Sequence, residues 1–372
     1  MGRSGARGPR GARLPAAALA GGWGPAARRL LAWFDPSRRP MPWRLTRDPY
    51  RIWVSEIMLQ QTTVAAVIPY YERFVAAFPA VAALAAAPPD RVMKLWEGLG
   101  YYTRARNLHA AARILVARHG GELPSTAAEL AALPGIGLST AGAIASIAFG
   151  RDEPVLDGNV RRVAARLLGM RGDLARPASL RTLWDASRKL ILRGKGRETA
   201  LALMDLGNLV CTPRGPRCPE CPLERYCLAR RDGTAEAIPL KPGRKPLPHY
   251  DIVVAVIGNA RGRILIRRRP DDGLLGGLWA FPGGKREDGE SPEAALVREI
   301  ADDLGIGIAV GAKIGAVRHA YSHFRVTLHA YRCRLVRGAV RASRDAKWIA
   351  PSGLAAYAFP RSNRRIADLL AG

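Results

Sequence analysis

Four cysteines crowd into a short stretch past the middle of the chain and constrain its folding more than any other feature. They stand at the spacing C-x6-C-x2-C-x5-C, within seventeen residues, as Cys211, Cys218, Cys221 and Cys227. Zinc ribbons usually separate two C-x2-C pairs by about a dozen residues or more, whereas this compact spacing suits a single cubane. A structural zinc and a pair of disulfides are the alternatives, and nothing else indicates the oxidising compartment that disulfides need. We therefore predict a [4Fe-4S] cluster, and a lone buried thiol at Cys333.

The chain carries a large excess of positive charge. Its 372 residues include 58 Lys and Arg against 31 Asp and Glu, a formal net charge of +27 spread over the whole length. Such a charge favours a polyanionic partner, although an arginine-rich proteome would produce the same excess. No apolar run approaches the length that spans a bilayer, so we expect no membrane segment.

Residues 1–24 are rich in arginine and alanine and contain no acidic residue. This composition faintly resembles a targeting peptide, but its glycines and prolines favour a disordered basic arm. An iron-sulfur centre also belongs in a reducing interior. We expect a cytoplasmic, nucleoid-associated monomer, with an organelle matrix as the alternative location.

Residues 25–233 have helical patterning throughout. Apolar residues recur with a 3.6-residue period, for example in 50–61, 103–119 and 158–168, and the Gly120-Gly121 pair is typical of a helix stop. We predict an all-α domain here.

Residues 250–372 have a different texture. Short Val/Ile-rich runs such as 252–257 and 264–266 precede a helix over 291–304 and further strands within 317–335. We predict an α+β domain. The proline-rich segment 234–249 between the two domains is typical of an extended linker.

A glycine-bearing turn, LPGIG at 133–137, joins two predicted helices. Gly135 and Gly137 would let the backbone turn tightly and present free N–H groups to a phosphate where the second helix begins. The pattern predicts a helix-hairpin-helix, although an ordinary helix connection can have the same residues.

Two carboxylates are candidates for acid–base chemistry. Glu56 has Ile52, Trp53 and Leu59 as its neighbours on a helix, so burial should raise its pKa and suit it to general acid work. A buried ion-pair partner is the alternative role for Glu56. Asp157 precedes a helix, where it could be an N-cap, a role that is compatible with catalysis.

The helical part resembles the helix-hairpin-helix DNA glycosylases that carry a [4Fe-4S] cluster, the family of endonuclease III and MutY. The segments that match MutY run almost continuously from 40 to 230; besides the hairpin they are MPWR (41–44), WVSEIMLQQT (53–62), GLGYYTRARNL (98–108), LDGNV (156–160) and MDLG (204–207). The resemblance implies a six-helix part at about 46–154 and a cluster-bearing part formed by 25–45 and 155–233.

The same resemblance implies excision of adenine paired with 8-oxoguanine in double-stranded DNA. Glu56 would protonate the adenine, Asp157 would stabilise an oxocarbenium-like sugar, and Asn159 would hold that carboxylate. The flipped adenine would leave a gap filled by Gln61 and Tyr101. The implied contacts to DNA or base are Trp43, Arg44, Gln61, Thr62, Leu99, Tyr101, Gly135, Gly137 and Ser139.

Two positions are informative within this resemblance. Bifunctional relatives carry a nucleophilic lysine where this chain has Ser139, which predicts a monofunctional glycosylase. Leu201 stands where MutY proteins usually have Gln or Glu, so a polar contact to the adenine is missing. An endonuclease III-like glycosylase and lyase for oxidised pyrimidines is the enzyme alternative, and a non-catalytic damage-binding protein is the other.

The second domain resembles the Nudix signature from Gly284 to Ile306, with Asp302-Asp303 in place of two glutamates. In Nudix hydrolases these acidic residues bind Mg²⁺. The resemblance to MutY implies instead a domain that recognises 8-oxoguanine, through Tyr321, Ser322 and His323. We predict recognition, with nucleotide hydrolysis as the minor alternative.

Overall fold

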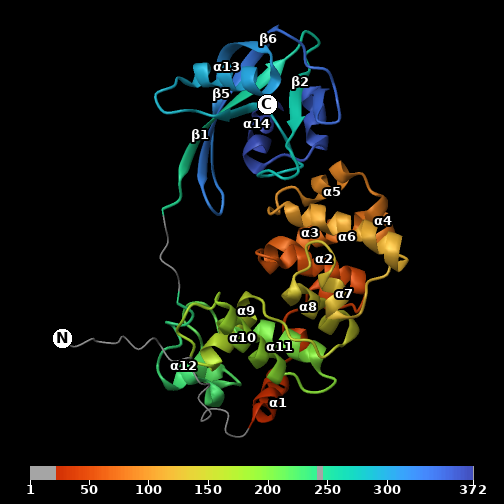
Figure 1. Ribbon diagram of the computed structural model, residues 1–372, viewed down its shortest axis with the longest axis vertical. Coiled ribbons are helices and arrows are strands. Elements are labelled where there is room, and N and C mark those ends of the chain that lie inside the picture. The colour runs from red at the N-terminus through yellow and green to blue at the C-terminus, as the bar shows by residue number, and fades with distance from the viewer. Residues whose placement is uncertain (1–21, 241–245, 372) are drawn as a thin grey trace, which may run out of the picture. The chain divides into compact units, whose positions relative to one another are not determined.

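The computed structural model describes residues 22–240 and 246–371 (Figure 1). Most of the predicted basic arm and part of the predicted linker lie outside these residues. The chain divides into two compact units, and neither is a continuous piece of sequence. The first unit is Met1–Glu56 with Leu123–Gly243, and the second is Ile57–Glu122 with Arg244–Gly372. The domain limits given above stay predictions.

The first unit is built from helices and short 3₁₀ turns. Helix α2 (Pro49–Leu59) crosses its boundary with the second unit. The other helices are α1 (Trp23–Trp33), α7 (Ala127–Ala131), α8 (Leu138–Phe149), α9 (Gly158–Leu167), α10 (Pro177–Lys189), α11 (Gly196–Leu209) and α12 (Leu228–Arg231). The 3₁₀ turns are η2 (Pro36–Arg38), η3 (Pro42–Arg44), η4 (Cys218–Glu220) and η5 (Glu224–Tyr226).

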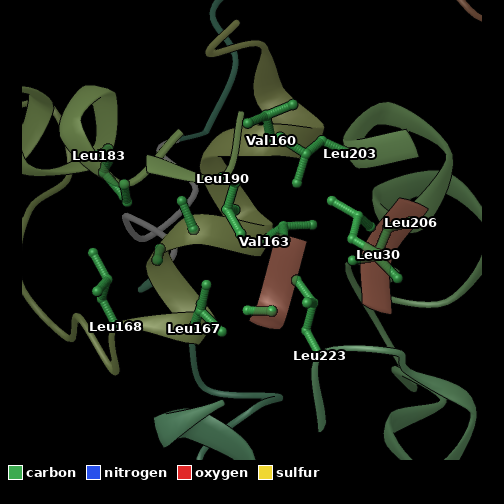
Figure 2. Packing of buried hydrophobic residues seen from close by; sticks show 14 of the residues in the cluster. Leu30, Val160, Val163, Leu167, Leu168, Leu183, Leu190, Leu203, Leu206 and Leu223 are labelled. Atoms are coloured by element: carbon green, nitrogen blue, oxygen red, sulfur yellow. The ribbon is translucent and has the colours of Figure 1, made fainter. Parts of the chain in front are cut away.

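An aliphatic core holds the first unit together. Leu30 of α1, Val163 of α9 and Leu206 of α11 are almost fully buried in one cluster, which Figure 2 shows from close by. Helices α9 and α11 approach closely because residue 207 is glycine, where a Cβ would lie 2.6 Å from the Asn159 Cβ. The core therefore fixes the start of α9, where two of the candidate residues lie.

The second unit combines a small helical layer with a mixed sheet. Its helical part contains α3 (Val64–Ala77), α4 (Val81–Ala86), α5 (Pro89–Trp96) and α6 (Thr103–His119). Phe74 packs edge-to-face against Phe78 and Trp96, with ring centroids 5.0 and 5.8 Å apart. This aromatic contact joins α3 to α5.

The sheet has seven strands within the described residues. They are β1 (His249–Gly258), β2 (Ile264–Arg268), β3 (Trp279–Ala280), β4 (Gly283–Lys285), β5 (Gly307–Ala320), β6 (Arg325–Arg337) and β7 (Ala346–Ile349). The main path runs β3-β2-β1-β6-β5, with β4 on β1 and β7 on β2. The β1–β6 pair is parallel, and the other pairs are antiparallel.

Helices cover both faces of the sheet. Alternation along β1 sends Val253 and Ala255 into a cluster with α13 (Pro292–Leu304), whereas Val254 joins a cluster with α14 (Arg361–Ala371). The 3₁₀ helix η6 (Pro351–Ala356) adds Leu354 to the second cluster.

The predicted fold class, an all-α glycosylase-type domain followed by an α+β Nudix-like domain, is confirmed. The helix predicted at 103–119 has these bounds in the structure, and Gly120 ends it with a φ of 61°. The further strands predicted within 317–335 are β5 and β6, which extend beyond these bounds, since β5 begins at Gly307 and β6 ends at Arg337. No described helix is long and apolar enough to cross a membrane.

Candidate active site and base-recognition loop

Glu56 lies on α2 beside the fully buried Trp53 and keeps only partial exposure. Burial raises its pKa from 4.5 to about 7, and repulsion from Asp157 adds to the rise while the Arg44 charge lowers it. In a substantial fraction of the protein molecules Glu56 is therefore protonated at neutral pH. A protonated carboxyl is the state that a general acid requires.

Asp157 is the N-cap of α9, as its position before a helix predicted. Its Oδ1 accepts a hydrogen bond from the Val160 N–H at 2.7 Å, and its Oδ2 accepts one from Asn159 Nδ2 at 3.1 Å. Burial raises the pKa of Asp157, and these hydrogen bonds and the Arg162 charge act against the rise. The two carboxylates influence each other electrostatically, so the first unit brings the predicted pair together.

Arg162 connects this carboxylate site to the cysteine loop. Its Nη2 donates to Asn159 Oδ1 at 2.9 Å and to the Gly207 carbonyl at 2.8 Å, and its Nε donates to the Cys211 carbonyl at 2.8 Å. A continuous set of hydrogen bonds thus runs from Cys211 through Asn159 to Asp157. Sequence reasoning missed Arg162, although its place five residues after Asp157 on the same helix was visible.

Arg44 is held in a fixed orientation beside the acid. Its guanidinium makes two hydrogen bonds of 2.7 Å to the buried Asp205 carboxylate, which also accepts one from Arg39 at 2.6 Å. Trp43, in the same 3₁₀ turn η3, is buried. Leu201 packs with Ile52, one helical turn before Glu56, so the position that lacks a polar residue is filled by apolar packing.

The glycine turn between α7 and α8 has the geometry of a hairpin. Gly135 has a φ of 78°, a region that favours glycine, and Gly137 is the N-cap of α8. Ser139, in the first turn of α8, accepts a hydrogen bond from the Leu156 N–H at 3.1 Å. The hairpin is therefore tied to the segment that carries Asp157.

The remaining helical candidates lie in the second unit. Gln61 and Tyr101 both have a positive φ, 57° and 48°, a backbone conformation that residues other than glycine rarely adopt. Arg104, which is 8% exposed, holds both segments. Its Nη1 donates to the Met58 carbonyl at 2.7 Å, and its Nη2 donates to the Gly100 carbonyl and to Thr62 Oγ1, both at 3.1 Å.

The β5–β6 loop, residues 321–324, places the three recognition candidates differently. Tyr321 packs its ring 4.8 Å from that of Phe324, and its hydroxyl lies 3.2 Å from Ser362 Oγ. Ser322 and His323 are exposed at the tip. Ser322 Oγ is 2.8 Å from Tyr101 Oη, so the second unit brings the loop against one of the strained residues. Leu99, beside Tyr101, is buried.

These observations can be set against known proteins. Residues 54–189 match the family described as HhH-GPD superfamily base excision DNA repair protein, and residues 253–369 match the NUDIX domain. Human adenine DNA glycosylase is 36% identical over 357 residues, covering 81% of this chain and 65% of the human protein. The adenine DNA glycosylase of Buchnera aphidicola subsp. Acyrthosiphon pisum is 33% identical over 307 residues, covering 82% and 85%. The chain belongs to the adenine DNA glycosylase family.

A solved structure supports the helical half of this family assignment. A thermostable thymine-DNA glycosylase matches with a TM-score of 0.51 at 31% identity, over 55% of this chain and 95% of that one. The chain spans just under two thirds of the human adenine DNA glycosylase, the first of these relatives.

As in the sequence signature, the acidic Nudix residues of this family member cluster on and near α13. Arg298 pairs with Glu290 at 2.9 Å and with Glu299 at 2.8 Å, and Arg267 pairs with Asp303 at 2.6 Å. In the described ranges no group of three or more His, Cys, Asp or Glu side chains is arranged to hold a metal ion, and this finding covers the four cysteines as well as these acidic residues. Three acidic side chains of the signature thus form ion pairs with arginines.

The four cysteines of this family member are partly buried free thiols that line one small cavity together with Arg166. The Arg166 guanidinium lies 3.2 Å from Cys211 Sγ, and the 3₁₀ turns η4 and η5 shape the loop between the other three cysteines. Burial raises the pKa of Cys221 to about 12 and that of Cys227 to about 11. Cys333 is a lone buried thiol, as predicted.

Proposed function

We propose that this protein hydrolyses the N-glycosidic bond of adenine mispaired in double-stranded DNA. The observation that carries the proposal is Glu56, a carboxyl whose pKa is raised to about 7 beside a second, hydrogen-bonded carboxylate, Asp157. Two carboxyl groups whose environments differ in this way suit an acid and a charge stabiliser. Membership of the adenine DNA glycosylase family supports adenine as the base.

In the proposed reaction Glu56 donates its proton to the adenine ring, and the bond to the sugar breaks as adenine leaves with the bonding electrons. Asp157 stabilises the positive charge that develops on the sugar, and Asn159 with the α9 amide holds that carboxylate in place. Water then adds to the cationic sugar and releases a proton, which returns to the Glu56 carboxylate through solvent, so the products are an abasic site and the restored acid. Arg44, fixed by Asp205, keeps a positive charge beside Glu56 that stabilises the carboxylate left after the proton transfer.

We further propose that the base opposite the adenine is 8-oxoguanine or guanine. The exposed Ser322 and His323 supply hydrogen-bonding groups at the tip of the β5–β6 loop, and Tyr321 stabilises the loop by packing its ring against that of Phe324. Gln61 and Tyr101 would fill the space left by the flipped adenine. Their strained backbones, both held by Arg104, are consistent with side chains fixed for that purpose.

We propose a monofunctional reaction without strand cleavage. Ser139 accepts a backbone hydrogen bond from Leu156 and has no amine with which to form a Schiff base. The net charge of +27 supports duplex DNA as the partner, with the hairpin amides at Gly135 and Gly137 on a phosphate. The expected monomer and the nucleoid location belong to the same proposal.

We propose that Cys211, Cys218, Cys221 and Cys227 hold a [4Fe-4S] cluster. Their soft sulfur donors line a single cavity, and the Arg166 guanidinium would offset the negative charge of the thiolates. A cluster there would act as a structural clip for the loop, since the carboxylate chemistry is redox-neutral. Through Arg162 the loop also supports Asn159.

Single-turnover base release tests the function. Adenine opposite 8-oxoguanine should be excised fastest, adenine opposite guanine more slowly, and thymine opposite either base not at all. Strand cleavage should require added alkali. No adenine release from either duplex, or rapid nicking without alkali, would contradict the proposal.

A further inference from the structure

Within the second unit, four residues that contact the Nudix-like part form one series along the helical layer, and Arg106 of α6 adds a separate contact to the Gly276 carbonyl. Asp90 and Lys94 lie on α5, and Glu97 and Tyr101 follow it directly, so the four are spaced by four, three and four positions. Asp90 and Lys94 share one face of α5 at this spacing, whereas Glu97 is the C-cap of α5 and Tyr101 follows on irregular backbone with a φ of 48°. Each of them contacts a residue of the Nudix-like part.

The contacts at the start of the series are modest. Asp90 accepts a hydrogen bond from Trp279 Nε1 at 3.1 Å and lies 3.7 Å from Lys347 Nζ. Lys94 donates to the Tyr357 carbonyl at 3.4 Å and pairs with Glu97.

Glu97 is the centre of the series. Its Oε1 accepts hydrogen bonds from the Phe359 N–H at 3.0 Å and from Arg364 Nε at 2.9 Å, while its Oε2 pairs with Lys94. The side chain is 15% exposed, so these charge-assisted bonds are shielded from water more than surface pairs are. One carboxylate therefore joins α5 to the start of α14.

A short, stiff segment links Glu97 to Tyr101. Gly98 has a φ of 96°, and a Cβ there would lie 2.4 Å from Tyr70 Oη, so only glycine fits. The Gly98 N–H donates to Tyr102 Oη at 2.9 Å, and Trp96 Nε1 donates to the Gly100 carbonyl at 3.1 Å. A shift of Glu97 would therefore be passed on to Tyr101.

A second path leads from Glu97 to the same place. Arg364, its partner, lies on α14 near Ser362, whose hydroxyl is 3.2 Å from Tyr321 Oη. Tyr321 supports the β5–β6 loop, and Ser322 of that loop meets Tyr101 at 2.8 Å. Glu97 is thus connected to Tyr101 through the 98–100 segment and to Ser322 through α14 and Tyr321. It therefore helps to position both partners of the Tyr101–Ser322 hydrogen bond.

We propose that Glu97 is a positioning residue that sets the register between Tyr101 and the β5–β6 loop, and thereby sets the preference for 8-oxoguanine over guanine opposite the adenine. The inference rests on the proposed function. Glu97 touches neither base nor sugar in this scheme, so the rate of the chemistry opposite guanine should depend on it little.

The test compares the full-length Glu97→Gln, Arg364→Gln and double variants with the parent protein. The control is Glu122→Gln, an exposed glutamate of the same unit. Single-turnover rates are measured on adenine opposite 8-oxoguanine and opposite guanine. The ratio of the two rates should fall about tenfold in each single variant, as loss of one charge-assisted bond implies, and no further in the double variant.

Amide exchange of the free protein, followed by mass spectrometry over 98–102 and 321–324, gives a readout that needs no lesion. Exchange should rise in both segments in Glu97→Gln and remain unchanged in the control. If Glu97→Gln does not fold, Glu97→Asp, which withdraws the carboxylate but keeps its charge, takes its place. An unchanged rate ratio, or equal losses on both duplexes, would overturn the inference.

The same measurements separate this inference from the proposed function. A parent protein that releases no adenine, or releases it equally from both duplexes, contradicts the proposed function, and with it the effect on preference. Unchanged exchange at 98–102 in Glu97→Gln overturns the positioning role alone, whatever the parent protein excises.

Discussion

The carboxylate pair of the first unit and the loops of the second unit are built in opposite ways. Glu56 and Asp157 lie partly exposed against a packed core, with burial shifting both pKa values upward. Gln61 and Tyr101 instead stand on strained backbone that polar contacts hold in place. In the proposed function, bond breaking would therefore depend on desolvation, whereas base recognition would depend on the positions of exposed groups.

Removing the acid should have the largest effect. Glu56→Gln keeps the size of the side chain but has no proton to donate, so adenine release should fall by about a thousandfold on both duplexes. Duplex binding, measured by fluorescence anisotropy, should change little. A loss confined to the 8-oxoguanine duplex would contradict this division of roles, because it would place recognition of the opposite base in the first unit.

Arg104→Met should produce the next largest effect, and it tests whether the strained backbone of the second unit is needed for excision. The variant loses the hydrogen bonds to the Met58 carbonyl at the end of α2 and to the Gly100 carbonyl, so both Gln61 and Tyr101 should relax. We expect excision to fall roughly a hundredfold, since small misplacements cost that much. Arg118→Met, at the exposed end of α6, is the control. Equal rates in the two variants would contradict the role of Arg104.

The sequence predicted the first region better than the second. The desolvated setting of Glu56 could be predicted because its apolar neighbours lie on its own helix, and the N-cap position of Asp157 because an N-cap acts within a few residues. Arg104 and Glu97 escaped notice because their partners, such as the Met58 carbonyl and Arg364, are distant in sequence or are backbone atoms. Local patterning shows periodicity and caps, but it does not show which distant segments a charged side chain joins.

The pH dependence of stability should show the desolvation of the first region. The folded pKa of Glu56 is about 7 against an ordinary 4.5, so between these values the folded state binds more protons than the unfolded state. The free energy of unfolding must then fall as pH rises from 4.5 to 7. Because Glu56 is partly exposed, we expect a contribution of about 2 kcal/mol rather than the full shift.

Chemical denaturation at pH 5 and pH 8 measures this contribution. Glu56→Gln cannot ionise, so its stability relative to the parent protein should improve by about that amount between the two pH values. Asp157, whose pKa is also raised, remains in both proteins, so only its electrostatic coupling to Glu56 enters the difference. A constant difference across the range would show that Glu56 is not desolvated.

Ser322→Ala should have the smallest effect, and it tests whether an exposed group can be specific. The hydroxyl lies 2.8 Å from Tyr101 Oη and is exposed, so its loss should lower excision opposite 8-oxoguanine only about fivefold and leave excision opposite guanine unchanged. Tyr101→Phe removes the other partner of the same hydrogen bond. Because the two changes delete one interaction, the double variant should lose little beyond the larger single loss. Fully additive losses would show that Ser322 and Tyr101 act on the DNA separately, and base recognition would then not depend on their mutual position.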